Sequence, residues 1–284
     1  MSKTVLLMVA LMLLFMYVGN AIAGEQGMIT ALIAAGGMNV FSYFFSDKLV
    51  LEQYNATEVT AQTEPQLYQI VQRLANKAGL PMPKVYVIPE QVPNAFATGR
   101  NPSHAAVAAT QGLLNMMSPE EVEGVLAHEM SHVKHRDILI GTVAAVFAGA
   151  IAMLANMMRS SVSANRSIPA STGNGRSGSK GLLAVILMPI AATIIRMTIS
   201  RTREFKADEG AAYLTGHPEW LMSALSKLDG YSQQYQMERA TSQTAHMFIV
   251  NPFNGVQALS QLFSTHPSTE ARLDALNRIR QELR

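Results

Sequence analysis

The sequence predicts a mainly α-helical integral membrane protein with a small β-sheet and about four transmembrane helices. Three observations support this fold class. Charged residues make up 15% of the 284 residues, against about 25% in an average soluble domain. Four long stretches carry no charge. The polar segment between the second and third stretches contains short apolar runs that are typical of β-strands.

The charge-free stretches span residues 4–24, 26–46, 138–158 and 181–195. A helix needs about 20 apolar residues to cross the hydrocarbon core, and the first three stretches reach that length. The fourth is shorter and contains Pro189, which membrane helices tolerate better than soluble helices do. Only "GEQG" separates the first two stretches, so we expect them to form a transmembrane hairpin.

Two other interpretations of these stretches stay open. Lys3, the apolar residues after it and "AIA" at 21–23 are also typical of a signal peptide with a small-residue cleavage site. The third and fourth stretches would also suit a helical hairpin buried in a soluble core.

Four spans would place residues 47–137 and 196–284 on the same side of the membrane. That side carries more lysines and arginines near the span ends than the other side does, which favours a cytoplasmic location for it. Residues 159–180 connect the third and fourth stretches. They are rich in Ser, Gly and Asn, which cannot bury a core, so we expect a flexible linker there.

The polar segment 47–137 contains the expected sheet. A helix is expected at 64–78, where the apolar residues Leu67, Ile70, Val71 and Leu74 recur with helical spacing. Strands are expected at 84–88, 94–99 and 104–110.

A second helix is expected over residues 118–135. Ser118 suits the N-cap position, and Pro119 suits the first turn. Glu121 follows the cap by three residues, as in a capping box. These signals predict the start of the helix well before its histidines.

The motif H-E-x-x-H occupies residues 128–132 of this second helix. Residues four apart on a helix have Cβ atoms about 5–6 Å apart, so His128 and His132 can both bind one zinc ion at about 2.0–2.1 Å. Glu129 lies beside the metal without binding it, where its carboxylate can take a proton from metal-activated water. The pattern indicates a metalloprotease. The alternative is an ordinary amphipathic helix with surface histidines.

A third ligand must come from elsewhere in the chain. His135 faces a similar direction, but seven residues rise about 10 Å along the axis, too far for a tetrahedral site with bonds near 2 Å. The absence of cysteine excludes thiolate ligands and disulfides. Glu204 and Asp208 lie four apart, so one can bind zinc and the other can accept a histidine ring N–H. A solvated helix face is the alternative.

Four stretches of the chain resemble the HtpX-type membrane zinc metalloproteases, which are relatives of the eukaryotic CAAX prenyl proteases. They are "VPNAFATGR" (92–100), "LAHEMSHVKHRD" (126–137), "SRTREFKAD" (200–208) and "FSTHPSTEARLDAL" (263–276). The resemblance implies a gluzincin-like membrane zincin that binds one Zn²⁺ ion. It further implies that Glu204 joins His128 and His132 as the third ligand, and that Asp208 is the aspartate of the same pattern.

The same resemblance nominates three further site residues. Asn94 belongs to a stretch that forms an edge strand beside the metal in such proteases, where an extended peptide can pair with the strand. A turn asparagine is the alternative for this residue. His266 and Arg272 resemble residues close to the metal, where a cation can stabilise an oxyanion. The alternative is that His266 simply precedes the last helix and that Arg272 lies on the solvated face of that helix.

The implied function is zinc-dependent cleavage of misfolded or damaged membrane proteins, or of unfolded polypeptides, at a bacterial inner membrane. The rivals are a prenyl-protein protease and a non-catalytic membrane chaperone or scaffold with a structural metal. A net charge of +2 gives no reason to expect a nucleic-acid partner. The expected domains are a transmembrane hairpin (1–46), two catalytic parts (47–137 and 200–284), and transmembrane helices three and four (138–199).

Overall fold

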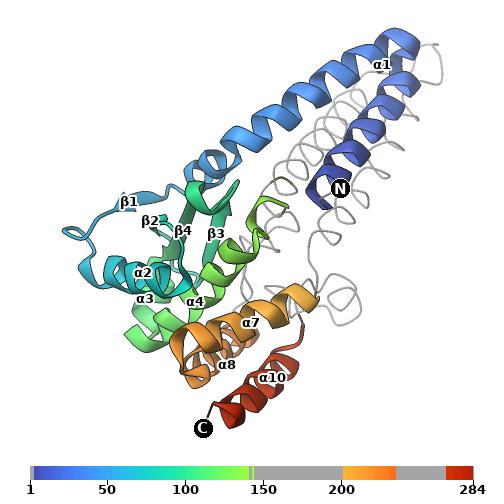
Figure 1. The fold of residues 1–284 in the computed structure, drawn as a ribbon. Helices are drawn as coiled ribbons and strands as arrows, with labels where there is room; N and C mark the ends of the chain where they lie inside the picture. Colours follow the sequence, from blue (N-terminus) through green and yellow to red (C-terminus); the bar gives the residue numbers. More distant parts are fainter. Residues whose placement is uncertain (1–2, 141–142, 144–200, 235–266, 284) are drawn as a thin grey trace, which may run out of the picture.

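The computed structural model describes residues 3–140, 143, 201–234 and 267–283. These residues form a long helical hairpin and a globular part in which helices surround a small sheet (Figure 1). The described fold is mainly α-helical with a small mixed sheet, as the sequence predicts.

The hairpin is formed by α1 (Lys3–Gln53), whose two arms meet at Ala23 and Gly24. Gly24 has a φ of 62°, a left-handed conformation that costs glycine little because it has no Cβ. Close to this turn, a Cβ atom added to Gly19 would collide with the backbone carbonyl of Gly27. Small residues therefore let the two arms approach each other closely.

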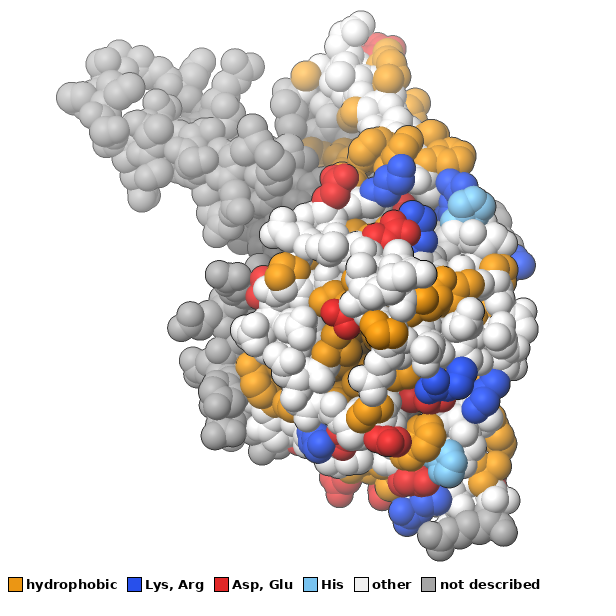
Figure 2. Space-filling view, turned by 90° about the vertical axis from the view of Figure 1, so that its left-hand side faces the viewer, with side chains coloured by type: hydrophobic (Ala, Val, Ile, Leu, Met, Phe, Trp, Pro, Cys, Tyr) orange, Lys and Arg blue, Asp and Glu red, His pale blue; other side chains and the backbone are white. Residues whose placement is uncertain are grey.

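Within the part of the chain that the structure describes, Ala23–Phe45 is long and apolar enough to cross a membrane, while Thr4–Asn20 is apolar but shorter. Large apolar side chains on both arms are exposed, among them Leu13 and Ile33 at 59% and 71%. In Figure 2 hydrophobic side chains gather on the upper part of the molecule, whereas charged ones are spread over the globular part below. The predicted span 181–195 and most of 138–158 lie outside the described residues.

The sheet has the strand order β1-β2-β4-β3. The strands are β1 (Thr57–Val59), β2 (Lys84–Ile88), β3 (Ala95–Gly99) and β4 (Ala105–Thr110). β2 and β4 are parallel, and the two outer pairs are antiparallel. The three strands expected from the sequence are confirmed, and β1 is an additional, very short strand. β3 lies at an edge of the sheet, next to α4.

Helix α4 (Pro119–His135) is the centre of the globular part. It packs against α2 (Pro65–Ala78), α7 (Arg201–Thr215), α8 (Pro218–Gln234) and β3. The remaining helices are α3 (Gln111–Met116), α10 (Thr269–Glu282) and the short 3₁₀ turn Pro102–His104. The predicted capping box is confirmed, because Ser118 and Glu121 each accept a hydrogen bond from the other's backbone N–H.

The main core lies on both sides of α4. Val125 and Leu126 are fully buried there, in one cluster with Leu74 of α2 and Leu225 of α8. Gly124 lets α8 come close, because an added Cβ would lie 2.7 Å from the backbone N of Leu221. This packing holds α4 rigidly between the sheet and the helices of the second half of the chain.

Candidate metal centre

His128 and His132 project from the same face of α4, as residues four apart on a helix do. His128 is 2% exposed, and His132 is half-buried. Their Nε2 atoms are 3.2 Å apart, and their rings meet edge to face at an interplanar angle of 87°. The two imidazoles therefore aim one nitrogen each at the same small volume.

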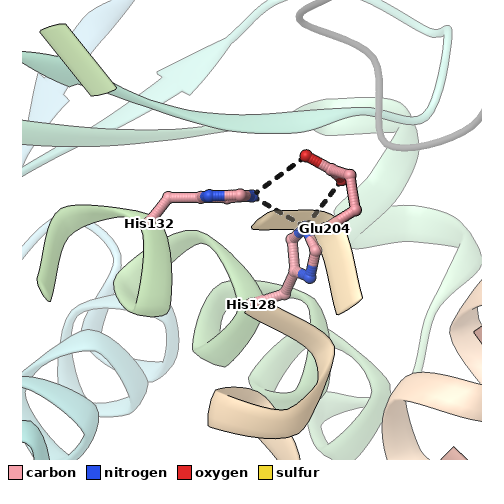
Figure 3. Close-up of side chains that lie close together, drawn as sticks. All are labelled: His128, His132 and Glu204. Atoms are coloured by element: carbon pink, nitrogen blue, oxygen red, sulfur yellow. Dashed lines mark hydrogen bonds and ion pairs between the residues drawn. The ribbon is translucent and has the colours of Figure 1, made fainter. Parts of the chain in front are cut away.

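Glu204 reaches this volume from α7, the helix most extensively packed on α4 (Figure 3). Its Oε2 lies 3.7 Å from His128 Nε2, and its Oε1 lies 3.6 Å from His132 Nε2. The candidate ligand atoms of the three residues all lie within 4.8 Å of one another. Glu204 is buried, so its carboxylate needs a positive partner to offset its loss of hydration.

Each histidine has a carboxylate at its other ring nitrogen. His128 Nδ1 lies 2.9 Å from Asp208 Oδ1, and His132 Nδ1 lies 3.5 Å from Asp137 Oδ2. A ring that donates its Nδ1 proton to a carboxylate presents a lone pair at Nε2. The Nε2 atoms of both histidines can thus act as metal ligands beside the Glu204 carboxylate. Two imidazole nitrogens and one carboxylate form a ligand set that suits a divalent transition metal such as zinc.

The electrostatics of the pocket also favour a cation. Burial lowers the pKa of His128, but the hydrogen bond to Asp208 and the nearby Glu204 carboxylate raise it more, to about 9. A positive charge at His128 Nε2 is therefore stabilised, and a bound metal ion can supply it as well as a proton. The residues present fit a metal ion by donor type, by convergence and by charge.

Arg272 of α10 holds Asp208 in place. Its Nε and Nη2 donate to the two carboxylate oxygens of Asp208 at 2.8 and 2.6 Å, and both residues are 1% exposed. Burial raises the pKa of Asp208, but the Arg272 charge and its hydrogen bonds outweigh that effect and lower it. Asp208 therefore stays ionised behind His128. The Arg272 guanidinium lies 3.4 Å from His128 Nδ1, the ring nitrogen that faces away from Glu204.

Glu129 is buried beside the cluster without joining it. Its Oε2 accepts a hydrogen bond from the backbone N–H of Ala97 at 3.0 Å. Ala97 belongs to β3, the edge strand, so this contact fixes the carboxylate between the ligand helix and the sheet edge. The sequence motif contains Glu129, but nothing in it indicates the partner on β3.

The remaining residues considered in the sequence analysis lie outside the cluster of three candidate ligands or outside the described residues. Asn94 is buried just before β3, where its backbone N–H donates to Thr110 Oγ1 at 2.8 Å. His135 lies outside the cluster, and its Nδ1 is 3.3 Å from Ser131 Oγ. His266 lies outside the described residues.

Asp137 was missed by sequence reasoning. It follows Arg136, whose left-handed conformation (φ 59°) ends α4 and turns the chain back, so that the Asp137 N–H donates to the carbonyl of His132. A helix C-terminus just after the second histidine was the available signal, because the first residue beyond such a turn stays close to the last turn of the helix.

This arrangement is that of a metallopeptidase. One buried helix supplies two histidines and a glutamate beside an edge strand, and a second helix supplies a further carboxylate. A model of Peptidase family M48 matches residues 61–280. The chain therefore belongs to peptidase family M48 and is a metalloprotease.

Relatives of similar length show that it is of the HtpX type. The chain is 59% identical to a Protease HtpX homolog of Campylobacter curvus over 288 residues, which covers 99% of this chain and 98% of the relative. Proteins of the same name from Campylobacter hominis and a Sulfurovum species are 60% and 55% identical, and each alignment covers at least 98% of both chains.

The fold is also similar to a solved structure. The crystal structure of S. mikatae Ste24p matches with a TM-score of 0.51 and 20% identity, over 95% of this chain and 61% of that chain. At this identity the likeness is one of fold.

Proposed function

We propose that the protein is an integral-membrane endopeptidase that uses one zinc ion, held by His128, His132 and Glu204. The observation that supports it best is the convergence of these three side chains, with ligand atoms within 4.8 Å of one another, from two helices far apart in the chain. When bound, zinc would supply Lewis-acid chemistry, polarising the scissile carbonyl and lowering the pKa of water.

Glu129 would be the general base and then the general acid. Its Oε2 is occupied by the N–H of Ala97, so Oε1 is the atom available to take the proton from the attacking water. The same atom would pass this proton to the leaving amine. The hydrogen bond to β3 would hold the carboxylate in one orientation during both transfers.

Asp208 and Asp137 would orient the two ligand histidines by accepting their Nδ1 protons. We propose that Arg272 acts through Asp208, in place of the oxyanion contact expected from the sequence, because its guanidinium lies at the far ring nitrogen of His128. His266 remains the candidate for stabilising an oxyanion, and Asn94 the candidate for binding the substrate backbone near the edge strand.

The substrates would be misfolded or damaged membrane proteins and unfolded polypeptides, cleaved at a bacterial inner membrane. The exposed apolar hairpin and the charge-free runs at 138–158 and 181–195 support a multi-pass protein of about four spans. The distribution of lysine and arginine supports a cytoplasmic catalytic side, built from residues 47–137 and 200–284.

The experiment is to measure bound zinc and peptide cleavage in detergent-purified variants. Glu204→Ala and His128→Ala should lose zinc and activity together, because each removes a ligand. Asp208→Ala should weaken zinc binding by about 10–100-fold, the usual cost of losing the partner of a ligand histidine. His135→Ala is the matched control, and it should keep zinc and most activity. A Glu204→Ala protein with full zinc would contradict the proposed ligand set.

A further inference from the structure

A cavity of about 520 Å³ lies between α2, α4 and α7, close to the candidate metal centre but separate from it. Lys134 of α4 is two residues from His132, and Lys206 of α7 is two residues from Glu204; both lysines line the cavity. Residues two apart on a helix do not face each other. The cavity therefore uses different faces of the two helices that carry the candidate ligands.

The cavity is positively charged. Lys77, Lys134 and Lys206 line it from three different helices, against the single carboxylate of Glu209. Among the residues that the structure describes, none of these three lysines has an ion-pair partner within 4.0 Å. Ammonium groups that surround a cavity without a partner attract an anion, because each additional cation lowers the energy of a negative charge placed between them.

Two other lysines that the structure describes are already neutralised. Lys84 pairs with Glu58 at 2.8 Å, and Lys227 pairs with Glu121 at 2.6 Å. Ser131 Oγ and His135 also line the cavity and lie 3.3 Å apart, so polar donors accompany the lysines. The three lysines thus differ from Lys84 and Lys227 in having no carboxylate partner, and from Lys48 in lining a common cavity.

We propose that this cavity binds a phosphate-bearing anion. Lysine ammonium groups bind phosphate as point charges, and basic pockets between helices at a membrane surface bind lipid headgroups. Helix α4 ends at His135, just before the apolar run 138–158, and the described part of α7, from Arg201 onward, follows the run 181–195 in the sequence. The two sources of this chemistry are therefore the headgroup of an anionic phospholipid and a free phosphate compound.

An anion between Lys134 and Lys206 would join α4 to α7. These helices already touch at the cavity, where a Cβ added to Gly210 would collide with Ser131 Oγ. Because His132 and Glu204 lie on the same two helices, the bound anion would stabilise the arrangement of the candidate ligands. Only this coupling rests on the proposed function, whereas anion binding itself does not depend on it.

The test measures binding to the full chain carrying Glu129→Gln, so the result is independent of peptidase activity. Native mass spectrometry counts phosphatidylglycerol retained from mixed phosphatidylglycerol and phosphatidylcholine nanodiscs, and calorimetry measures inorganic phosphate binding in phosphatidylcholine nanodiscs. The double variant Lys134→Gln with Lys206→Gln is compared with the control Lys48→Gln with Lys84→Gln. Both pairs remove the same charge, but the control lysines do not line the cavity.

We expect the cavity pair to weaken anion binding by about 30-fold, since a lysine close to an anionic surface contributes about a factor of five in affinity. The control pair should stay within about threefold of the parent. Lys77→Gln, on a helix that carries no candidate ligand, should weaken binding by about fivefold, and Glu209→Gln should strengthen it. This opposite sign separates a site from a general loss of folding.

Loss of phosphatidylglycerol alone would identify a lipid headgroup as the ligand, and loss of phosphate alone would identify a free phosphate compound. Loss of both would mean that the site takes phosphate in either form. If the control pair weakens binding as much as the cavity pair does, the attraction belongs to the whole surface and the proposal is wrong. It is equally wrong if neither pair changes the binding of either probe.

Discussion

Glu129 and its histidine neighbours share one helix but contact different partners. The Nε2 atoms of His128 and His132 face each other and Glu204, whereas the Glu129 carboxylate accepts the N–H of Ala97 on β3. A carboxylate that is not a metal ligand can gain and lose a proton while the metal stays bound. In the proposed mechanism, metal binding and proton transfer therefore belong to different residues.

Glu129→Gln should keep bound zinc and lose about 10²–10⁴-fold in peptide hydrolysis, the usual contribution of a general acid–base group. Glutamine has nearly the same shape and can still accept the Ala97 N–H, but it takes up no proton. Zinc per chain and cleavage of an unfolded polypeptide are measured together. Glu120→Gln, at the exposed start of the same helix, should have normal activity. Near-normal turnover by Glu129→Gln would contradict the mechanism.

Arg272→Met should destabilise the fold by about 3–5 kcal/mol, because it leaves the buried Asp208 carboxylate without its cation. Thermal unfolding of the purified protein gives this cost, and zinc titration should show weaker binding as well. Arg278→Met on the exposed side of the same helix is the matched control, expected within about 0.5 kcal/mol of the parent. Equal unfolding temperatures for the two variants would exclude a supporting role for Arg272.

At the scale of elements, the site depends on how closely α4 packs against its neighbours. Gly124 faces the backbone of α8, where an added Cβ would lie 2.7 Å from Leu221 N and 2.9 Å from the carbonyl carbon of Trp220. Gly230 of α8 has nothing within 4 Å of the same added atom. Close helix packing therefore requires glycine at position 124, whereas the space around position 230 would accommodate alanine.

Gly124→Ala should lower the free energy of unfolding by about 1–3 kcal/mol, because the backbone of α8 cannot yield as a flexible side chain can. Gly230→Ala should raise it by about 0.5–1 kcal/mol, since alanine loses less backbone entropy in a helix. Thermal unfolding in detergent measures both. The same substitution is thus expected to change the free energy of unfolding in opposite directions at the two positions. Changes in the same direction would contradict this account of α4–α8 packing.

The whole molecule combines an apolar hairpin with a polar catalytic part. The exposed leucine and isoleucine side chains of α1 form an apolar surface of the kind that marks contact with a membrane or another protein. The charged residues of the globular part instead require water. In the proposed arrangement, the hairpin lies in the membrane and the candidate metal centre lies in the globular part beside it.

The proposed four spans predict that residues 159–180 face the periplasm. The chain has no cysteine, so a single introduced thiol reports its own location. An impermeant thiol reagent should label Ser171→Cys in intact spheroplasts. Ser103→Cys, exposed on the catalytic part, should be labelled only after lysis. If Ser171→Cys also needs lysis, the third and fourth apolar runs do not both cross the membrane.

The sequence by itself determined features that depend on near neighbours along the chain. The helical repeat places His128 and His132 on one face, and the capping residues Ser118 and Glu121 set the start of that helix. The strands at 84–88, 94–99 and 104–110 and the turn between the arms of α1 follow from equally local patterns. In each case the side-chain direction is fixed by backbone geometry over a few residues.

Only the tertiary structure decided which of these faces meet. The spacing of Glu204 and Asp208 was compatible with zinc binding and with a solvated face, and the packing of α7 on α4 brings both to the histidines. The pairings of His132 with Asp137, of Glu129 with the Ala97 N–H and of Asp208 with Arg272 are likewise known only from the fold. Contacts between distant segments depend on the sum of many weak apolar contacts around α4, which no short stretch of sequence contains.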